Sequence, residues 1–255
     1  MFVMSEEKTS TIAQLISNAE KFFMQEQDLF GNVLYPSLSE SRESSASGKI
    51  KKAGQESSPS SYPAEPWTSV STIAELNTAI CECQKCPLGA TRTKFVFGVG
   101  NPNADVVIIG EAPGADEDAR GEPFVGRAGQ LLNKILEAIH FKREEVFICN
   151  ILKCRPPNNR DPLAEEVERC EPYLWKQLEL INPKIILCLG RISAQVLLKT
   201  NESLTHLREN VHQYRGIPLI VTFHPAALLR NPHWKRPTWE DVQKFRKMYD
   251  ELKNK

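Results

Sequence analysis

Four short apolar runs, separated by helical patterns, constrain the fold of this chain most strongly. Leu131, Leu132, Ile135, Leu136 and Ile139 mark one helical face, and "LAEEVERCEPYLWKQLELI" and "RISAQVLLK" supply two further helical patterns. Strands that alternate with helices are typical of a parallel sheet buried on both faces. We therefore expect an α/β fold, a three-layer α/β/α sandwich with a central, mainly parallel four-stranded sheet. The four expected strands are "ADVVIIG" (104–110), "VFICNILKC" (146–154), "PKIILCLG" (183–190) and "IPLIVTFHP" (217–225).

Three regions follow one another along the chain. Residues 1–35 include "IAQLISNAEKFF", whose apolar positions predict an amphipathic helical segment, either a peripheral helix or a partner-binding one. Residues 36–66 are rich in Ser, Pro and charge without periodicity, which predicts a flexible linker. The folded domain is expected over 67–255. Thr72 and Glu75 have the spacing of a capping box, so a short helix should begin there.

Composition excludes some classes of protein and leaves others open. Lys plus Arg and Asp plus Glu both number 32, so net charge favours neither a nucleic acid nor an acidic partner. No run of about 18 apolar residues occurs, which predicts that the chain has no membrane span. The N-terminus lacks the pattern of a secretory signal, and we expect a cytoplasmic protein. Seven cysteines in a reducing compartment indicate metal or cluster ligands rather than disulfides.

Three of the expected strands end in residues that suit a binding site. The turn Gly110–Gly114 follows the first strand, Asn150 follows the second, and His224 follows the last. Ligands of open α/β sheets gather at the carboxyl ends of the strands. The sequence therefore predicts a site where these three segments converge.

Four cysteines have the spacing of a thiolate site. Cys83 and Cys86 form "CQKCPL", and Cys154 and Cys170 lie far downstream in "KCRPPNNR" and "RCEPYL". Spacing alone fits an iron–sulfur cluster and a zinc ion equally well. The other cysteines include two that lie inside apolar runs and are expected to be buried and free, and one neighbour of the first pair that complicates the ligand assignment; they are Cys149, Cys188 and Cys81.

Four motifs in order, "GEAPGADEDARGEPFVGRAGQLL", "CNILKCRPPNNRDP", "CEPYL" and "HPAALLRNP", together resemble the family 4 uracil-DNA glycosylases. The likeness covers roughly Thr72 to the C-terminus. It implies a uracil-DNA glycosylase-like fold and a structural [4Fe–4S] cluster on the four cysteines just described, in preference to zinc. It also implies a monofunctional hydrolase that flips uracil out of DNA, breaks its N-glycosidic bond and leaves an abasic site for base excision repair.

The resemblance also implies roles for three side chains. Phe124 would stack on the flipped base, although an isolated phenylalanine is more often core. Asn150 would donate to uracil O4 and accept from N3–H, where the alternative is a turn-forming asparagine. His224 would stabilise the charge that collects on uracil O2, where the alternative is a surface histidine.

The acidic turn is harder to interpret. Ala112 stands where distantly related family 1 enzymes, with "GQDPY", carry the aspartate that orients water. We expect Glu111 to line the uracil pocket and backbone groups of the turn, from Gly110 to Gly114, to hold the water. Asp116–Asp118 are expected to be a solvated helix-capping run, with an acidic metal site as the alternative.

The expected partner is uracil-containing DNA, single- or double-stranded, bound by a monomer whose product passes to downstream repair proteins. The segment "ALLRNPHWKRP" is expected to contact it, with an apolar wedge and basic residues for phosphates. Its DNA-binding candidates are Leu228, Leu229, Arg230, Lys235 and Arg236. Two alternatives are a non-enzymatic iron–sulfur DNA-binding module and a relative that becomes covalently trapped on uracil. The second carries an inserted basic segment that this sequence lacks.

Overall fold

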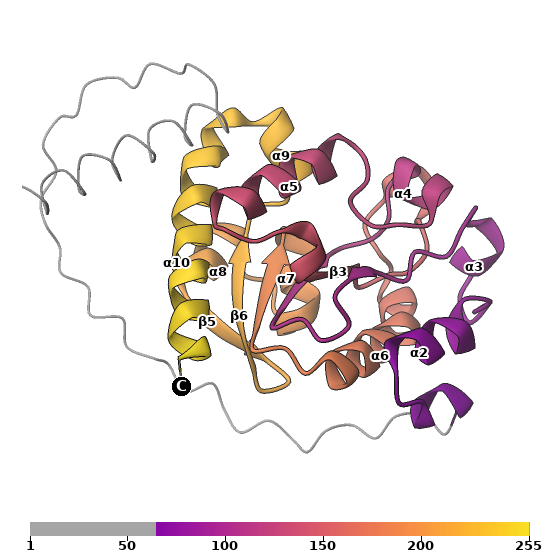
Figure 1. Ribbon diagram of the computed structural model, residues 1–255. Coiled ribbons are helices and arrows are strands. Elements are labelled where there is room, and N and C mark those ends of the chain that lie inside the picture. Colours follow the sequence, from indigo (N-terminus) through magenta and orange to yellow (C-terminus); the bar gives the residue numbers. More distant parts are fainter. Residues whose placement is uncertain (1–64, 255) are drawn as a thin grey trace, which may run out of the picture. The chain divides into compact units, whose positions relative to one another are not determined.

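The computed structural model describes residues 65–254, which fall within one compact unit, so the segments expected over 1–35 and most of 36–66 lie outside the described residues. A six-stranded sheet has the order β1-β3-β2-β4-β6-β5. Figure 1 shows β3, β6 and β5 of this sheet among the surrounding helices. The four central strands are β3 (Phe147–Asn150), β2 (Val106–Gly110), β4 (Ile185–Leu189) and β6 (Ile217–Thr222), all parallel. These are the four strands expected from the apolar runs.

Two antiparallel edge strands complete the sheet and were not expected. They are β1 (Val99–Gly100), which pairs with β3, and β5 (Val211–Tyr214), which pairs with β6. The sheet is therefore mixed, with a four-stranded parallel centre. Parallel strands cannot be joined by tight hairpins, and helices cross between them as the sequence pattern predicts.

The helices connect these strands and cover both faces of the sheet. The α-helices are α2 (Ile73–Ile80), α3 (Leu88–Thr91), α4 (Ala115–Arg120), α5 (Arg127–Ala138), α6 (Ala164–Ile181), α7 (Arg191–Leu198), α8 (Leu204–Glu209), α9 (Pro225–Arg230) and α10 (Lys235–Lys253). Short 3-10 turns are η1 (Pro66–Ser69), η2 (Arg143–Glu145), η3 (Pro157–Asn159) and η4 (Pro232–Trp234). The expected capping box begins α2: Glu75 N–H donates to Thr72 Oγ1 at 3.1 Å, and Thr72 N–H donates to the Glu75 carboxylate at 3.1 Å.

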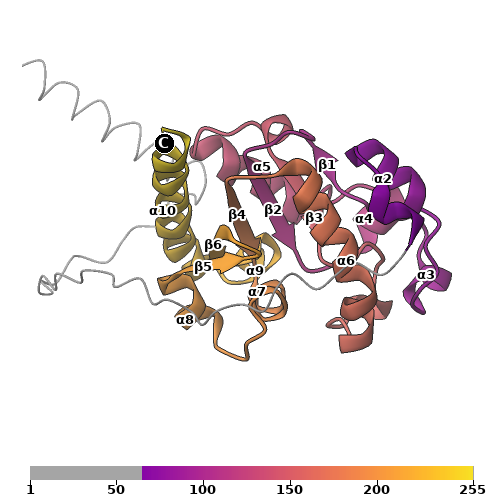
Figure 2. The same cartoon turned by 90° about the horizontal axis from the view of Figure 1, so that it is seen from below.

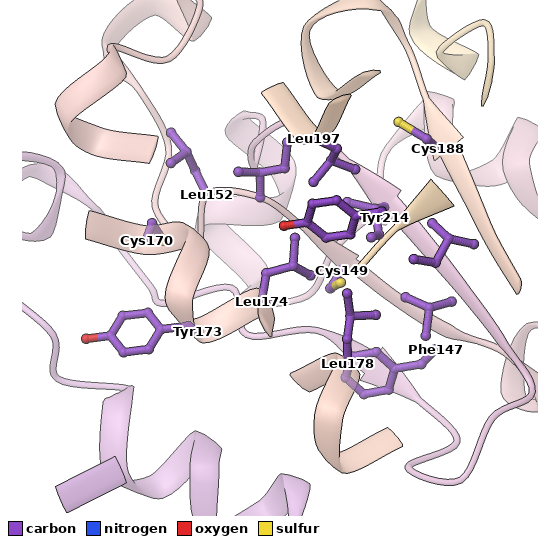
Figure 3. Close-up of a cluster of buried hydrophobic side chains, with 14 of the residues drawn as sticks. Phe147, Cys149, Leu152, Cys170, Tyr173, Leu174, Leu178, Cys188, Leu197 and Tyr214 are labelled. Atoms are coloured by element: carbon purple, nitrogen blue, oxygen red, sulfur yellow. The ribbon is translucent and has the colours of Figure 1, made fainter. Parts of the chain in front are cut away.

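The core is divided between the two faces of the sheet. One cluster joins Cys149 and Cys188 of the strands to α6 and α7 residues such as Leu174 and Leu197 (Figure 3). Neighbouring strand residues such as Ile108 are equally buried and lie outside this cluster. Figure 2 shows the strands between α5 and α6, with α10 at one side. Because the four central strands are parallel, their carboxyl ends lie at one edge of the sheet, where the site is built.

The helices of the described part include none that is long and apolar enough to cross a membrane.

Candidate active site

The ends of β2 and β3 bring the first two site residues together. Gly110 and Asn150 are paired across the parallel ladder. A Cβ on Gly110 would lie 2.4 Å from Asn150 Oδ1 and 2.8 Å from Phe124 Cζ. Glycine is therefore required at this strand end, because it lets the Asn150 amide and the Phe124 ring approach one another across the bare backbone.

Phe124 is held in an unusual backbone conformation. Its φ is 53°, in the left-handed region that a non-glycine residue seldom adopts. A Cβ on Gly129 would lie 1.8 Å from the Phe124 carbonyl oxygen, so the turn passes directly over α5. Arg143 donates to the Pro123 carbonyl at 2.7 Å. The surrounding contacts fix the ring, which is 5% exposed, less than a freely accessible stacking platform would be.

His224 faces the same ring from the end of β6. The centroids of the Phe124 and His224 rings are 5.4 Å apart, with planes tilted by 31°. His224 is the N-cap of α9, where its Nδ1 accepts the Ala226 N–H at 3.2 Å. A Cβ on Gly190, whose φ is 97°, would lie 3.0 Å from His224 Cβ, so this strand end is also kept bare.

The protonation state of His224 follows from these contacts. Burial, with a smaller contribution from Arg230, lowers the pKa of the imidazole to about 4. The ring is therefore neutral at pH 7. Because Nδ1 accepts a backbone hydrogen bond, the proton lies on Nε2, which is a donor.

The turn after β2 combines a perturbed acid with an apolar residue. Burial, together with the charge of Asp161, raises the pKa of Glu111 to about 7, against the opposing charge of Arg191. Ala112 is half-buried and packs against the core. The carbonyls of Gly110 and Glu111 accept N–H groups of Ile151 and Leu152, each at 3.0 Å, which ties the turn to the segment after Asn150.

The acidic run after this turn is less solvated than expected. Glu117 caps α4 by accepting the Gly114 N–H at 3.1 Å, and Asp116 is exposed. Asp118, in contrast, is 6% exposed and accepts the Thr93 N–H with both carboxylate oxygens, at 2.9 and 3.1 Å. The prediction of a solvated run is therefore wrong for Asp118, whose carboxylate anchors the loop before β1.

Sequence reasoning missed a buried lysine behind the site. Lys153 has no exposed surface, and its Nζ donates to the Asn150 carbonyl at 2.7 Å and to Gln177 Oε1 at 2.6 Å. Gln177 in turn donates to the Phe97 carbonyl at 2.9 Å. Lys153 thus fixes the backbone of Asn150. The Lys-Cys pair in "KCRPP" was the available signal, but a lysine in a polar motif is ordinarily a surface residue.

The four cysteines of the predicted thiolate site come from three segments. Cys83 and Cys86 follow α2, Cys154 follows β3, and Cys170 lies in α6. The Tyr173 hydroxyl donates to Cys83 Sγ at 3.2 Å, Arg92 Nη1 to Cys154 Sγ at 3.4 Å, and the Lys153 N–H to Cys170 Sγ at 3.3 Å. Hydrogen bonds of this kind stabilise thiolate sulfurs around iron–sulfur clusters.

The thiols interact electrostatically across these segments. Burial, with smaller contributions from Cys154 and Cys86, raises the pKa of Cys170 to about 12, and Lys153 opposes this increase. Thiolates here would need a bound cation. Within residues 65–254, no three His, Cys, Asp or Glu side chains are already arranged to hold one metal ion. Cys149 and Cys188 are free and buried in the core, as expected, while Cys81 is half-exposed.

The segment after His224 differs from the predicted wedge in one residue. Leu228 has no exposed surface, because α9 turns it into the core, so it cannot reach DNA as expected. Leu229 is exposed, as are Arg230 and Arg236, and Lys235 is half-buried. Only one leucine of the expected pair therefore lies at the surface.

The chain is similar to proteins of known activity over its described region. The family model described as the uracil DNA glycosylase superfamily matches residues 97–253. A type-4 uracil-DNA glycosylase of Archaeoglobus fulgidus is 43% identical over 182 residues, which cover 68% of this chain and 92% of that protein. One from Saccharolobus solfataricus is 45% identical over 184 residues, covering 68% and 83%. One from Thermotoga maritima is 44% identical over 167 residues, covering 64% and 87%.

Proposed function

The chain belongs to the type-4 uracil-DNA glycosylases of the uracil DNA glycosylase superfamily, and from this premise we propose how its residues recognise and release the base. It is a uracil-DNA glycosylase, a monofunctional hydrolase of the N-glycosyl bond, and DNA is its partner. The observation that carries the proposal is the convergence of Phe124, Asn150 and His224 around Gly110 and Gly190.

Asn150 reads the edge of the flipped base. Its buried amide donates to uracil O4 and accepts from N3–H. Cytosine presents the opposite pattern of donor and acceptor, which leaves buried groups unpaired, and a site built on such hydrogen bonds rejects the wrong partner strongly. Phe124, although only 5% exposed, supplies the aromatic face against which the ring of the base lies. Because the surrounding contacts fix both side chains, the hydrogen bonds of Asn150 and the stacking face of Phe124 are in place before the base enters.

His224 stabilises the leaving group. Rupture of the N-glycosidic bond leaves an oxocarbenium-like sugar and a uracil anion, whose charge collects partly on O2. The Nε2–H of the neutral imidazole donates to that oxygen, and the hydrogen bond strengthens as the charge grows. The Ala226 N–H orients the ring by fixing Nδ1 as an acceptor.

Glu111 and the backbone of its turn position the attacking water. Ala112 offers no carboxylate, so the neighbouring carboxylate of Glu111 accepts a proton from the water as it adds to the sugar. A group whose pKa is about 7 is well matched to this task near neutral pH. Burial is the main cause of the raised pKa, and the paired charges of Asp161 and Arg191 change it in opposite directions.

We also propose that Cys83, Cys86, Cys154 and Cys170 hold a [4Fe–4S] cluster. The donor set supports this, because four thiols from three segments lie beside hydrogen-bond donors to three of the four sulfurs. When bound, the cluster supplies a structural link rather than redox chemistry. It would join the loop after α2 to α6 and to the segment after Asn150.

Replacement of Cys170 with serine tests the cluster. Purified wild-type protein should absorb broadly near 400 nm and contain about four irons per chain. Cys170→Ser should lower both the iron content and the unfolding midpoint, because metal binding is coupled to folding. Cys81→Ser is the matched control and should keep both. Colourless wild-type protein with one stoichiometric zinc would contradict the proposal.

Release of free uracil tests the proposed function. A uracil-containing oligonucleotide should yield free base and an alkali-labile abasic strand, with no strand cleavage before alkali. The same strand with thymine in place of uracil is the control.

We propose further that the enzyme acts as a monomer and passes its product to downstream repair enzymes. Its seven free cysteines suit a reducing compartment such as the cytoplasm.

A further inference from the structure

An exposed tryptophan follows the active-site histidine along the chain. Among the described residues, four large apolar side chains are exposed, and two of them, Leu229 and Trp234, lie within eleven residues of His224. They belong to α9 and to η4, which are separated by a single residue, Asn231. Trp234 is 39% exposed. Contiguous exposed apolar surface is what distinguishes interaction sites from single exposed side chains, so the surroundings of the indole decide its role.

The indole is held in one orientation by a stack of planar groups. Trp234 lies on the Phe223 ring, with centroids 4.9 Å apart and planes tilted by only 14°. The Arg208 guanidinium lies over the same Phe223 ring, 4.4 Å from its centroid. Arg208 is itself fixed by two hydrogen bonds to Asp241, at 2.6 and 2.9 Å. The exposed indole is therefore pre-organised, with little rotamer entropy left to lose on binding.

The surroundings of the indole suit a nucleic acid strand. Arg230, Lys235 and Arg236 flank it in the sequence. Arg236 also forms an ion pair with the exposed Glu240 at 3.5 Å. Basic side chains around an exposed aromatic ring are typical of single-strand binding surfaces. Phe223, the middle member of the stack, directly precedes His224, so the same short segment of backbone carries the stack and the active-site imidazole.

We propose that Trp234 stacks on an unpaired nucleobase next to the uracil nucleotide, as the outermost plane of the Arg208–Phe223–Trp234 stack. The proposal rests on the proposed function, since it places a neighbouring base of the same strand. It makes Trp234 a positioning residue: it holds the strand so that the uracil nucleotide reaches His224. It also predicts preferential engagement of locally unpaired DNA, because a paired base cannot offer its face.

Affinity measurements with probes that lack the base next to the uracil nucleotide test the stacking directly. The probe is a single-stranded oligonucleotide with 2′-fluorodeoxyuridine, whose fluorine slows bond rupture so that binding is measured without cleavage. Companion probes replace the 5′ or the 3′ neighbour with a tetrahydrofuran residue that lacks a base. Trp234→Ala should weaken binding of the full probe roughly 5- to 150-fold, as loss of one stacked base does. The loss should shrink to about twofold or less on one of the two companion probes.

Two control variants complete the experiment. Trp234→Phe keeps a stacking face and should retain most of the affinity, whereas Val211→Ala, which shortens another exposed apolar side chain, should leave affinity unchanged. An equal loss on all probes, or no loss on any, would overturn the proposal. These affinity measurements do not require cleavage of the probe. Failure of the wild-type enzyme to release uracil would therefore refute the proposed function separately.

Discussion

Removal of the His224 imidazole should slow bond rupture far more than it weakens DNA binding. The structure leaves one donor, Nε2–H, for the leaving uracil, since Nδ1 is occupied by the Ala226 N–H. Loss of one pre-organised donor to a developing anion costs about 3–4 kcal/mol. His224→Ala should therefore lower the single-turnover rate about 10²- to 10³-fold, while the affinity for DNA changes little, because the lost interaction grows only in the transition state.

The assay is single-turnover uracil release, with affinity for the uncleaved strand measured alongside. His206→Ala provides the matched control, because His206 of α8 is exposed and pairs with Glu202, which precedes the helix. This control should keep the wild-type rate. If His224→Ala retains near-normal chemistry and loses DNA affinity, His224 is a DNA contact and the assignment is wrong.

The pH dependence tests the neutral state of the same ring. The pKa of His224 is lowered to about 4, so the imidazole is neutral at every pH above about 5. The rate should therefore not fall as pH rises through 6.5, the ordinary histidine pKa. A tenfold loss per pH unit above 6.5 in the wild type, absent from His224→Ala, would show that the active form is the imidazolium.

Two further substitutions test the groups around the pocket. Glu111→Gln should abolish a rise in the excision rate between about pH 6 and 8, because the carboxylate with a pKa of about 7 is the form that accepts the water proton; a wild-type profile flat over that range would contradict this. Lys153→Met should lower the free energy of unfolding by about 2–5 kcal/mol, because it leaves the Asn150 carbonyl and Gln177 Oε1 buried without their donor. Urea unfolding measures the loss, and Lys176→Met, whose partner Glu179 is half exposed, should lose less.

The centre of the fold could be predicted from the sequence because buried parallel strands are continuous apolar runs. The edge strands β1 and β5 could not, for a physical reason. β1 has two residues, and β5 reads "VHQY" with only Tyr214 buried, so neither carries the periodicity of a buried strand. Their pairing is set by the neighbouring strand rather than by their own side chains.

The site was predictable where a residue follows a strand directly. Asn150 is the last residue of β3, and His224 follows β6. The parallel topology alone therefore brings both residues to one edge of the sheet. Burial at single positions was not predictable. Leu228 and Leu229 are neighbours of the same type, and only the rotation of α9 decides which one faces the core. Lys153 and Asp118 are buried because tertiary hydrogen bonds satisfy them, which no local pattern reveals.

The central claim is that the strand end at Gly110, which has no side chain, leaves Asn150 placed to recognise uracil. The base selectivity of Asn150→Asp tests this claim most directly. Single-turnover release is measured from strands that differ only in carrying uracil or cytosine. The wild type should release uracil and not cytosine. Asn150→Asp places an acceptor opposite uracil O4, and the lost hydrogen bond and the repulsion together should lower uracil release about 10²-fold or more. A folded Asn150→Asp enzyme that releases uracil within about threefold of the wild-type rate would contradict the account.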